Sequence, residues 1–382
     1  MGEDILEKLM AIDPTILTYI VRQDQNDLAF DITDWTAKRL SDKGGTNPDG
    51  LWLFSGQGNS DKGSRHWSVV LKILQRQHDE LPADNVWHWK RESSWAQSGL
   101  SKQLQGPGPV KAPRIYHSEE TPEGAWIWME HVQGTRSGPW TLDEYAFAAH
   151  QFGLWNGSYL TGSSLPSEPW LARQHYRAWL AIVDFEGALR FPLNQKYIPG
   201  ETLARYERLW YERETFFNAL ESLPQVFSHF DSHRRNLLIR TSRTNQKELV
   251  ALDWGECGVG AIGAELNWLI GYSAMLLEWP PAELPSLEEV AFPSYIQGLR
   301  ESGWKGNTDL VRLGFTAMLA VYLGCAHPGL AANLCAAENR EVALRRLGFA
   351  EDELFLRVLP GFDYVLDRAD AARTLLKKLG LA

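Results

Sequence analysis

The sequence predicts an α+β protein with two lobes, a small lobe built on an antiparallel sheet and a large, mainly helical lobe. The chain has 382 residues, which at roughly 150 residues per domain is enough for two domains. Up to about residue 130 it reads as strands with one long helix, and beyond about residue 140 it is mostly helical by periodicity. We therefore expect an N-terminal lobe over residues 1–130 and a C-terminal lobe over residues 131–382.

The composition is typical of a globular protein with an acidic balance. Hydrophobic residues make up 44% of the chain and charged residues 23%, which excludes a disordered or fibrous chain. The formal net charge of −10 removes the electrostatic attraction that draws basic proteins to nucleic-acid phosphates or anionic lipids. We expect neither a nucleic acid nor a membrane as a partner, and the sequence leaves the oligomeric state open.

Cysteine usage and the N-terminus predict a cytoplasmic protein. The three cysteines form no CxxC pair, which disfavours a disulfide framework or a thiolate zinc site. The segment MGEDILEKLM carries acids where a secretory signal would carry bases, and it has no apolar core. The longest uncharged stretch, 313–337, contains Pro328 and Gly329, so we expect a buried helix, a turn and a second helix there rather than a membrane span.

The first lobe is predicted to contain a helix, a three-stranded meander, a second helix and a hairpin. In chain order these elements are 5–12, 28–40, 51–54, 66–74, 85–104 and 113–134. The glycine-rich segments 41–50 and 56–63 are the expected turns of the meander, because glycine and its polar neighbours are the usual turn residues. The composition changes near the end of the hairpin, where we place a hinge at about 129–134.

The second lobe begins with a helix that has a clear start signal. Thr141 and Glu144 form a capping-box pattern, which predicts a helix over 141–160. Residues 201–221 form another, with apolar side chains on one stripe. The segments that follow are a loop, a hairpin over about 237–253, a second loop, a helix from about 263, and further helices over 285–382.

The sharpest chemical signal is HFDSHRRN (229–236), followed after the hairpin by Asp253. Phosphoryl transfer needs a carboxylate that orients the acceptor hydroxyl and takes its proton. It also needs oxygen ligands that hold magnesium against the nucleotide phosphates. We predict Asp231 as the base and Asn236 with Asp253 as the magnesium ligands, while His229 braces the loop.

The first lobe supplies residues suited to bind the nucleotide. Lys72 lies in a strand otherwise made of Trp, Val, Leu and Ile, so we expect its ammonium to have a partner. Glu92, on the following helix, is the natural one, and such a pair presents a lysine to the α- and β-phosphates of ATP. If the segment after the last strand of this lobe is the hinge, the backbone groups of Glu130 and Val132 would bind adenine.

Over residues 28–290 this order of motifs resembles the aminoglycoside phosphotransferase family, which shares the protein-kinase-like fold with choline kinases. The HxDxxxxN element followed by DW is the most specific part. The resemblance implies ATP and magnesium as cofactors and a small-molecule hydroxyl as the acceptor, with Asp231, Asn236, Asp253, Lys72 and Glu92 in the roles given above. Glycines before Glu265 match the loop that such enzymes carry after the metal aspartate.

Several alternatives stay open. The phosphates could be covered by the segment 41–50 or by 56–63, and ATP is not distinguished from GTP. A protein kinase is disfavoured, because Phe230 stands where protein kinases have arginine and no APE motif follows. A nucleotide-binding pseudokinase that acts as an interaction module is the other alternative, and the presence of all five residues argues against it. Aminoglycosides, macrolides, sugars and amino alcohols are all possible acceptors.

Two further expectations concern control and the acceptor. Because the phenyl ring of Phe230 cannot bind a phosphate, and the stretch from Asp253 to Glu265 has no residue to phosphorylate, we expect an enzyme that is active as made. Glu256 and Glu265 are expected near the acceptor, where they would favour a cationic molecule. Glu265 could equally cap a helix N-terminus.

Overall fold

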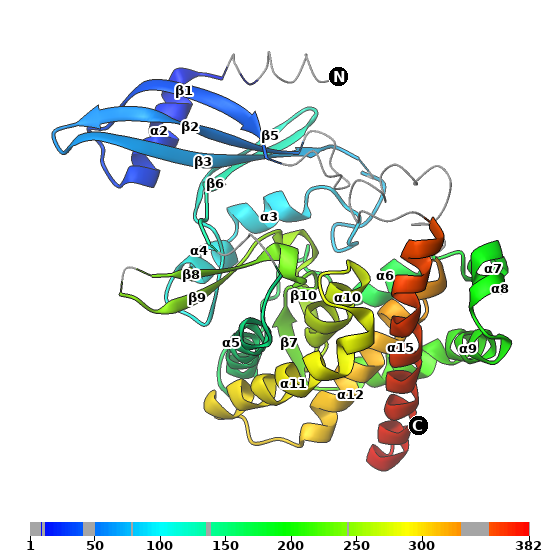
Figure 1. The fold of residues 1–382 in the computed structure, drawn as a ribbon. Helices are drawn as coiled ribbons and strands as arrows, with labels where there is room; N and C mark the ends of the chain where they lie inside the picture. The colour runs from blue at the N-terminus through cyan, green and yellow to red at the C-terminus, as the bar shows by residue number, and fades with distance from the viewer. Residues whose placement is uncertain are drawn as a thin grey trace. The chain divides into compact units, whose positions relative to one another are not determined.

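The computed structural model describes residues 9, 12–40, 50–77, 79–134, 139–242, 244–329 and 351–381. The chain divides into two compact units (Figure 1). Unit 1 comprises residues 1–83, 87–107 and 111–134, and unit 2 comprises residues 84–86, 108–110 and 135–382. Most of the helix expected at 5–12 and of the turn expected at 41–50 lies outside the described residues.

Unit 1 is built on a five-stranded sheet in the order β1-β2-β3-β6-β5. Every neighbouring pair is antiparallel. The strands are β1 (Asp31–Arg39), β2 (Leu51–Ser60), β3 (Gly63–Gln75), β5 (Ile115–Thr121) and β6 (Gly124–Glu130), and the helices are α2 (Pro14–Gln25), α3 (Arg91–Gln97) and α4 (Gly99–Gln105). The single helix expected at 85–104 is wrong, because the extended backbone of Ser98 (ψ 165°) divides it into α3 and α4.

Alternation along β3 explains how the sheet is covered. Trp67, Val69, Leu71 and Ile73 are buried in one cluster with apolar residues of α2, such as Ile20. Successive side chains of a strand point to opposite faces. The even-numbered residues of β3, Lys72 among them, therefore lie on the face opposite to α2.

The turn expected at 56–63 is wrong, because β2 runs through these glycines and only Asp61 and Lys62 make the turn. Gly56 and Gly58 are needed for close packing. A Cβ atom on Gly56 would lie 2.0 Å from the carbonyl oxygen of Asp34, and one on Gly58 would lie 2.3 Å from the ring of Phe30. Both positions exclude a side chain, so the glycines let β1 and the core approach β2.

Unit 2 is mainly helical. Its helices of eight or more residues are α5 (Leu142–Thr161), α9 (Gly200–Ser222), α11 (Leu284–Glu301), α12 (Thr308–Met318) and α15 (Glu351–Leu379). Its shorter helices are α6 (His175–Leu180), α7 (Phe185–Arg190), α8 (Pro192–Tyr197) and α10 (Ser273–Met275), with the π-helical turns Asn267–Tyr272 and Leu319–Gly324. The Thr141 hydroxyl accepts from the Glu144 N–H, and the Glu144 carboxylate accepts from the Thr141 N–H, so the expected capping box is present.

Four short strands of unit 2 carry the loops of interest. β7 (Gln225–Ser228) pairs with β10 (Gly258–Ala261), and β8 (Leu237–Thr241) pairs with β9 (Lys247–Ala251), both antiparallel. The short strand β4 (Val110–Lys111) completes a sheet in the order β4-β9-β8. A buried network supports β7, because the Asn156 amide donates to Phe227 O (2.8 Å) and the Tyr295 hydroxyl donates to Asn156 Oδ1 (2.7 Å).

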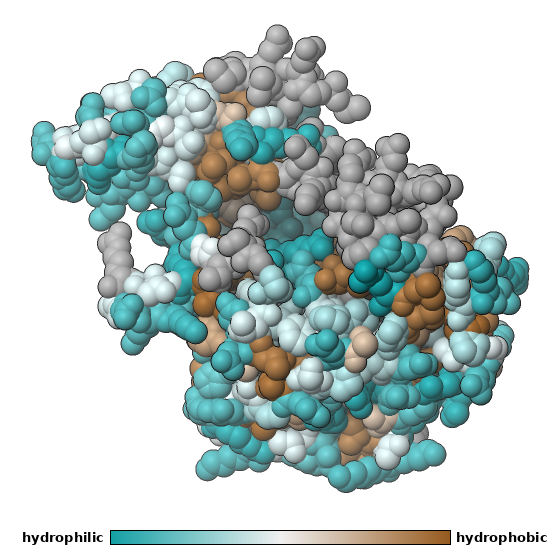
Figure 2. Space-filling model, viewed as in Figure 1, coloured by the Kyte–Doolittle hydropathy of each residue, from teal (hydrophilic) through white to brown (hydrophobic). Residues whose placement is uncertain are grey.

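One helical stretch, Thr308–Gly329, is long and apolar enough to cross a membrane by length and composition alone. In this structure 89% of its apolar window is buried inside the protein, so it is a core helix. This agrees with the burial expected for the uncharged stretch, of which residues 330–337 lie outside the described part. The face of unit 2 visible in Figure 2 is largely hydrophilic with scattered hydrophobic residues, as on an ordinary globular surface.

Candidate active site

The loop after β7 holds Asp231 with polar contacts from two residues of the same loop. The Asn236 amide nitrogen donates to the Asp231 carbonyl (3.0 Å) and to its carboxylate Oδ2 (2.5 Å). His233 Nε2 lies 3.4 Å from the other carboxylate oxygen. The Asp231 side chain keeps 20% of its surface exposed, so the carboxylate is oriented and still reachable.

The β8–β9 hairpin brings the second loop to the first. Leu237 pairs with Ala251, and the Leu252 N–H donates to Asn236 O (2.7 Å). Because Asp253 follows Leu252, the backbones of Asn236 and Asp253 are neighbours. The structure thus brings together all three residues that the sequence predicted in this lobe.

His229 fastens the two loops to each other. Its Nε2–H donates to Leu252 O (2.9 Å), and its Nδ1 accepts from the Asp231 N–H (3.2 Å). A single neutral tautomer satisfies both bonds. The ring is buried and packs edge-on against Trp254 at 4.6 Å. The role of a brace expected for His229 agrees with these contacts.

Two non-glycine residues beside the site have left-handed backbones. Phe230 and Asp253 both have φ of 61°. Such a conformation costs about 1–3 kcal/mol for a residue with a side chain, and it persists only where the surroundings impose it. Residues in this region concentrate at functional sites, which fits their position next to Asp231 and at Asp253 itself.

Glu265 is the main site residue whose place the sequence did not predict. Its carboxylate accepts from the His229 N–H (2.9 Å) and from the Ser232 hydroxyl, and it is buried. Burial raises the pKa of Glu265 to about 7, against the hydrogen bonds from Ser232 and His229 that lower it. The expectation that Glu265 faces the acceptor is therefore wrong. A lone carboxylate in the apolar run GAELNWLIG was the available signal.

His233 is a neutral side chain beside Asp231. Burial and the neighbouring Arg235 charge lower its pKa to about 3, and Asp253 opposes them only in part. Its Nδ1 accepts from the Arg235 N–H (3.2 Å), which leaves the proton on Nε2, the atom that faces Asp231. Although the two side chains are close, this is a contact between a neutral imidazole and a carboxylate rather than an ion pair.

Both arginines of the loop are held by Glu278. Arg235 Nε donates to one carboxylate oxygen (2.5 Å), and Arg234 Nε lies 3.7 Å from the other. Arg235 also donates to Leu276 O (3.1 Å). One carboxylate thus faces both guanidinium groups inside unit 2.

In unit 1, Lys72 of β3 forms an ion pair with Glu92 of α3. The two side chains are 13% and 8% exposed. A buried ion pair has lost much of its hydration, so each charge is stable only in contact with the other. The pair therefore fixes the positions of both side chains. The pairing matches the one expected from the sequence.

The sheet register decides which connection lies near Lys72. Lys72 is paired with Leu51, the first residue of β2, and the Leu40 N–H donates to Leu51 O (2.8 Å). The connection from Leu40 to Gly50 therefore begins across β2 from Lys72 and ends beside it. The Asp61–Lys62 turn lies at the other end of the hairpin, about 30 Å away at roughly 3.3 Å per residue.

The strand β6 ends at Glu130, where the expected hinge begins. The Glu130 N–H donates to Arg114 O (2.8 Å), and the Glu130 carboxylate accepts from the Arg114 N–H (3.1 Å). His131 Nδ1 lies 2.9 Å from the Ser68 hydroxyl, which fixes the chain as it leaves the sheet, and Val132 follows in irregular structure. A polar cavity of about 550 Å³ adjoins Glu130 and Ser68.

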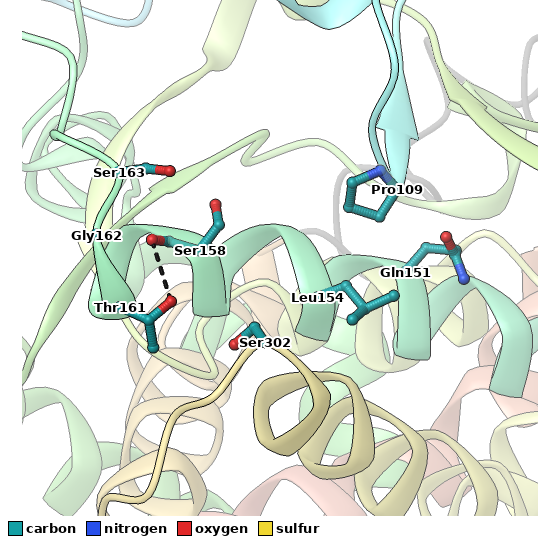
Figure 3. Close-up of a pocket in the computed structure, with 8 residues that line it drawn as sticks. All are labelled: Pro109, Gln151, Leu154, Ser158, Thr161, Gly162, Ser163 and Ser302. Atoms are coloured by element: carbon teal, nitrogen blue, oxygen red, sulfur yellow. Dashed lines mark hydrogen bonds between the residues drawn. The ribbon is translucent and has the colours of Figure 1, made fainter.

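A second cavity of about 550 Å³ lies in unit 2 on α5 and the residue after α11 (Figure 3). Its lining includes Ser158, Thr161 and Ser302, whose hydroxyls donate to backbone carbonyls of their own helices. The residues that line this cavity carry no formal charge. It offers no group for phosphoryl chemistry and contains none of the predicted site residues.

A model of the phosphotransferase enzyme family matches residues 88–301. The chain belongs to this family. The resemblance and the enzyme class expected from the sequence are thereby confirmed for this phosphotransferase. No curated protein sequence matches it significantly.

Solved structures similar to the phosphotransferase are small-molecule kinases. An amicoumacin kinase in complex with AMP-PNP, Ca²⁺ and Ami is 13% identical, with a TM-score of 0.52 over 96% of each chain. A microcompartment-associated aminopropanol kinase is 14% identical (TM-score 0.51; 94% and 98% covered). A choline kinase from Cryptosporidium parvum Iowa II is 15% identical (TM-score 0.50; 97% and 98% covered). These matches confirm the α+β, two-lobed, protein-kinase-like fold.

Proposed function

We propose that this phosphotransferase moves the γ-phosphoryl group of ATP to a hydroxyl of a small molecule, with magnesium. The observation that supports it best is the position of Asn236, whose amide holds the Asp231 carboxylate while its backbone carbonyl binds the residue before Asp253. A proton acceptor and two oxygen ligands are thus joined by short hydrogen bonds. Such a reaction depends on positioning and charge neutralisation, and no covalent enzyme intermediate is needed.

Asp231 acts as the general base in this proposal. Its carboxylate accepts the hydrogen bond of the acceptor hydroxyl, orients the oxygen toward the phosphorus, and takes the proton as the new O–P bond forms. Asn236 donates to one oxygen of the carboxylate and His233 lies beside the other, which restricts the orientation of its plane. The neutral state of His233 matters here, because a permanent ion pair would make Asp231 a weaker base.

The residues beside Asp231 fit magnesium. The Asn236 nitrogen is committed to Asp231, which leaves its amide oxygen for a metal, and Asp253 supplies a carboxylate. Magnesium prefers oxygen ligands and usually keeps water and substrate phosphates, so two protein ligands suffice. Among the described residues there is no group of three or more His, Cys, Asp or Glu that could hold a metal ion. When bound, the ion would neutralise phosphate charge.

Unit 1 binds the nucleotide in this proposal. Lys72, held by Glu92, contacts the phosphates, and the backbone groups of Glu130 and Val132 bind adenine. The register at Lys72 favours the connection 41–50 over 56–63 as the cover of the phosphates, since the second lies in β2 and at its far end. Val70, two positions before Lys72, and its partner Leu53 lie on the same face of the sheet as Lys72. In this proposal these apolar side chains contact the base.

The names of the similar structures support a small hydroxylated acceptor. They are kinases of amicoumacin, aminopropanol and choline, and the first was solved with AMP-PNP. We infer an acceptor of the same general size class, whose identity a screen must supply. The pseudokinase alternative is disfavoured because the base, the metal ligands and the lysine pair are all present.

The proposal is tested by incubating the protein with Mg-ATP and a metabolite and antibiotic panel, with product detection by mass spectrometry. We expect an 80 Da mass gain on one class of alcohol in the wild type and none with Asp231→Asn. If the protein binds nucleotide but transfers phosphate to no acceptor and hydrolyses no ATP without one, the pseudokinase alternative is favoured.

A further inference from the structure

A segment outside the motifs, residues 170–180, is attached to the loop that follows Asp253. The Val259 N–H donates to Ala172 O (2.7 Å), and the Ala172 N–H donates to Cys257 O (3.4 Å). A Cβ atom on Gly258 would lie 2.0 Å from Ala172 O, so this glycine permits the contact. The attachment leads directly into α6, whose first residue is His175.

His175 contacts both loops of the candidate site. Its Nε2 lies 2.6 Å from the Glu256 carboxylate, and its ring centroid lies 5.1 Å from that of Phe230. Glu256 ends the short 3-10 helix for which Asp253 is the N-cap, and Phe230 directly precedes Asp231. One imidazole thus contacts a residue three positions after the metal aspartate and the residue before the base.

Each of the two loops that His175 contacts contains a residue with a strained backbone. Phe230 and Asp253 have left-handed backbones, which only surrounding contacts can maintain. The Phe230 ring is enclosed, because a Cβ atom on Gly260 would lie 2.4 Å from it and Trp268 packs at 5.2 Å. Removing a contact from either loop should let its backbone relax toward an ordinary conformation.

A histidine at this position is not explained by packing alone. The His175 side chain is 1% exposed, and its Nδ1 has no hydrogen-bond partner among the described residues. A phenylalanine would pack against Phe230 and Tyr322 without burying such an atom. The imidazole therefore costs stability that a phenyl ring would not, and what it gains is the bond to Glu256.

We propose that His175 is a positioning residue that, through Glu256 and Phe230, holds the base loop and the metal loop in their strained, reactive arrangement. The inference rests on the proposed function, since it assumes that Asp231 and Asp253 carry the reaction. It assigns no contact with substrate to His175. It predicts that the pair affects turnover more than nucleotide binding.

The test uses His175→Phe, which keeps the aromatic packing and removes the bond to Glu256. The full-length protein is assayed for Mg-ATP hydrolysis without acceptor. We expect kcat to fall about tenfold, which corresponds to about 1.4 kcal/mol in the barrier, and KM for ATP to rise by less than kcat falls. The melting temperature should be unchanged or higher. Amide hydrogen exchange of peptides covering 229–236 and 252–257 should become several-fold faster.

Four further variants make the result specific. Glu256→Ala should reproduce the His175→Phe effect, and Glu256→Gln, whose amide oxygen still accepts from Nε2–H, should restore most of the activity. The double variant His175→Phe with Glu256→Ala should be no slower than either single variant. The matched control is His150→Phe, which removes a histidine–glutamate contact of 2.8 Å between α5 and α11 and should change neither kcat nor exchange in these peptides.

Wild-type kcat and wild-type exchange in folded His175→Phe would overturn the inference, as would an equal loss in His150→Phe. If His175→Phe does not fold, Glu256→Ala, whose carboxylate is 34% exposed, decides by the same measurements. Full hydrolysis by Asp231→Asn would instead contradict the proposed function. An inactive Asp231→Asn beside a fully active His175→Phe would remove only the positioning role.

Discussion

Lys72 in unit 1 lies on a regular strand, whereas Asp231 and Asp253 in unit 2 lie on loops. The position of Lys72 follows from the register of β3 with β2 and from one ion pair with Glu92. The positions of Asp231 and Asp253 depend on buried polar contacts from distant residues, such as Glu265, and on backbones that are locally unfavourable. A strand thus fixes its residue through the repeating ladder, and a loop needs separate contacts for each turn.

This difference has consequences for how each half should respond to substitution. A change at Lys72 removes one charged contact and leaves the ladder that positions it. A change at a residue that braces the loops alters the geometry of several groups together. This follows because His229, Asn236 and Glu265 all hydrogen-bond to backbone groups of the same two loops. The predictions below probe that contrast, beginning with the largest effect.

The largest effect is expected from Asp231→Asn. An amide cannot take the acceptor proton, so turnover should fall by about 10²–10⁴, the usual contribution of a general base. Affinity for Mg-ATP should stay close to wild type, because Asp231 is assigned no metal contact. Initial rates on the acceptor found by the panel, together with calorimetric nucleotide binding, measure both. Unchanged acceptor phosphorylation would remove Asp231 from the mechanism.

The next effect concerns the second loop. Asp253→Ala should weaken magnesium-dependent nucleotide binding by about 10–100-fold or more, since a site with two protein ligands loses its only carboxylate. Asn236→Ala should weaken it less, and should also lower turnover by releasing Asp231. Calorimetry with and without magnesium separates the two. Wild-type Mg-ATP affinity in Asp253→Ala would exclude it as a ligand.

A smaller effect is expected from the strand-held residue. Lys72→Ala should lower kcat/KM for ATP by about 10–100-fold, the range for a lost hydrogen bond to a charged group. It should also lower stability, because the Glu92 carboxylate stays buried after losing this ion pair. Glu92→Gln should have a milder effect of the same kind. Lys62→Ala is the matched control, since Lys62 lies on the same hairpin at its far end and is exposed. An equal loss in Lys62→Ala would contradict the choice of the connection 41–50 as the phosphate cover.

The sequence predicted features that depend on a repeating pattern or on residues close in sequence. Strand alternation and the Thr141 capping box are local signals, and both led to elements that the structure contains. The glycines of β2 were misread, because the same residue type serves turns and close packing. Helix α2 was missed although Asp13 before Pro14 is a start signal.

Motif spacing placed the three loop residues together, but it could not reveal what holds them. Glu265 reaches His229 across 36 positions of sequence, and His175 reaches Glu256 across 81. Such contacts depend on how β7, β10 and α6 pack, which no local pattern encodes. The break at Ser98 is similar, since an extended residue inside a helical pattern is selected by its surroundings.

The smallest and most specific effect is the pH dependence that Glu265 gives to stability. Burial raises the pKa of Glu265 to about 7 in the folded protein, from an ordinary value of 4.5. Between these values the folded state keeps a proton that the unfolded state has released, so stability falls as pH rises. The stability contributed by the protonated Glu265 carboxyl is complete below pH 4.5 and is lost by about pH 7. Above that pH, this group no longer makes stability depend on pH.

Glu265→Gln removes this titration. We expect the wild-type free energy of unfolding, measured in urea, to decline relative to the variant by about 1–3 kcal/mol between pH 4.5 and 7. Glu212→Gln is the control. Although burial opposes it, hydrogen bonds from Arg208 and Arg373 leave the pKa of Glu212 below its ordinary value, so its own slope lies under pH 4.5. Parallel curves for wild type and Glu265→Gln from pH 4.5 to 7 would show that the loop brace is ionised throughout. In that case the loops would be held by a charged carboxylate, and the contrast with the ion-paired strand of unit 1 would be smaller than the structure indicates.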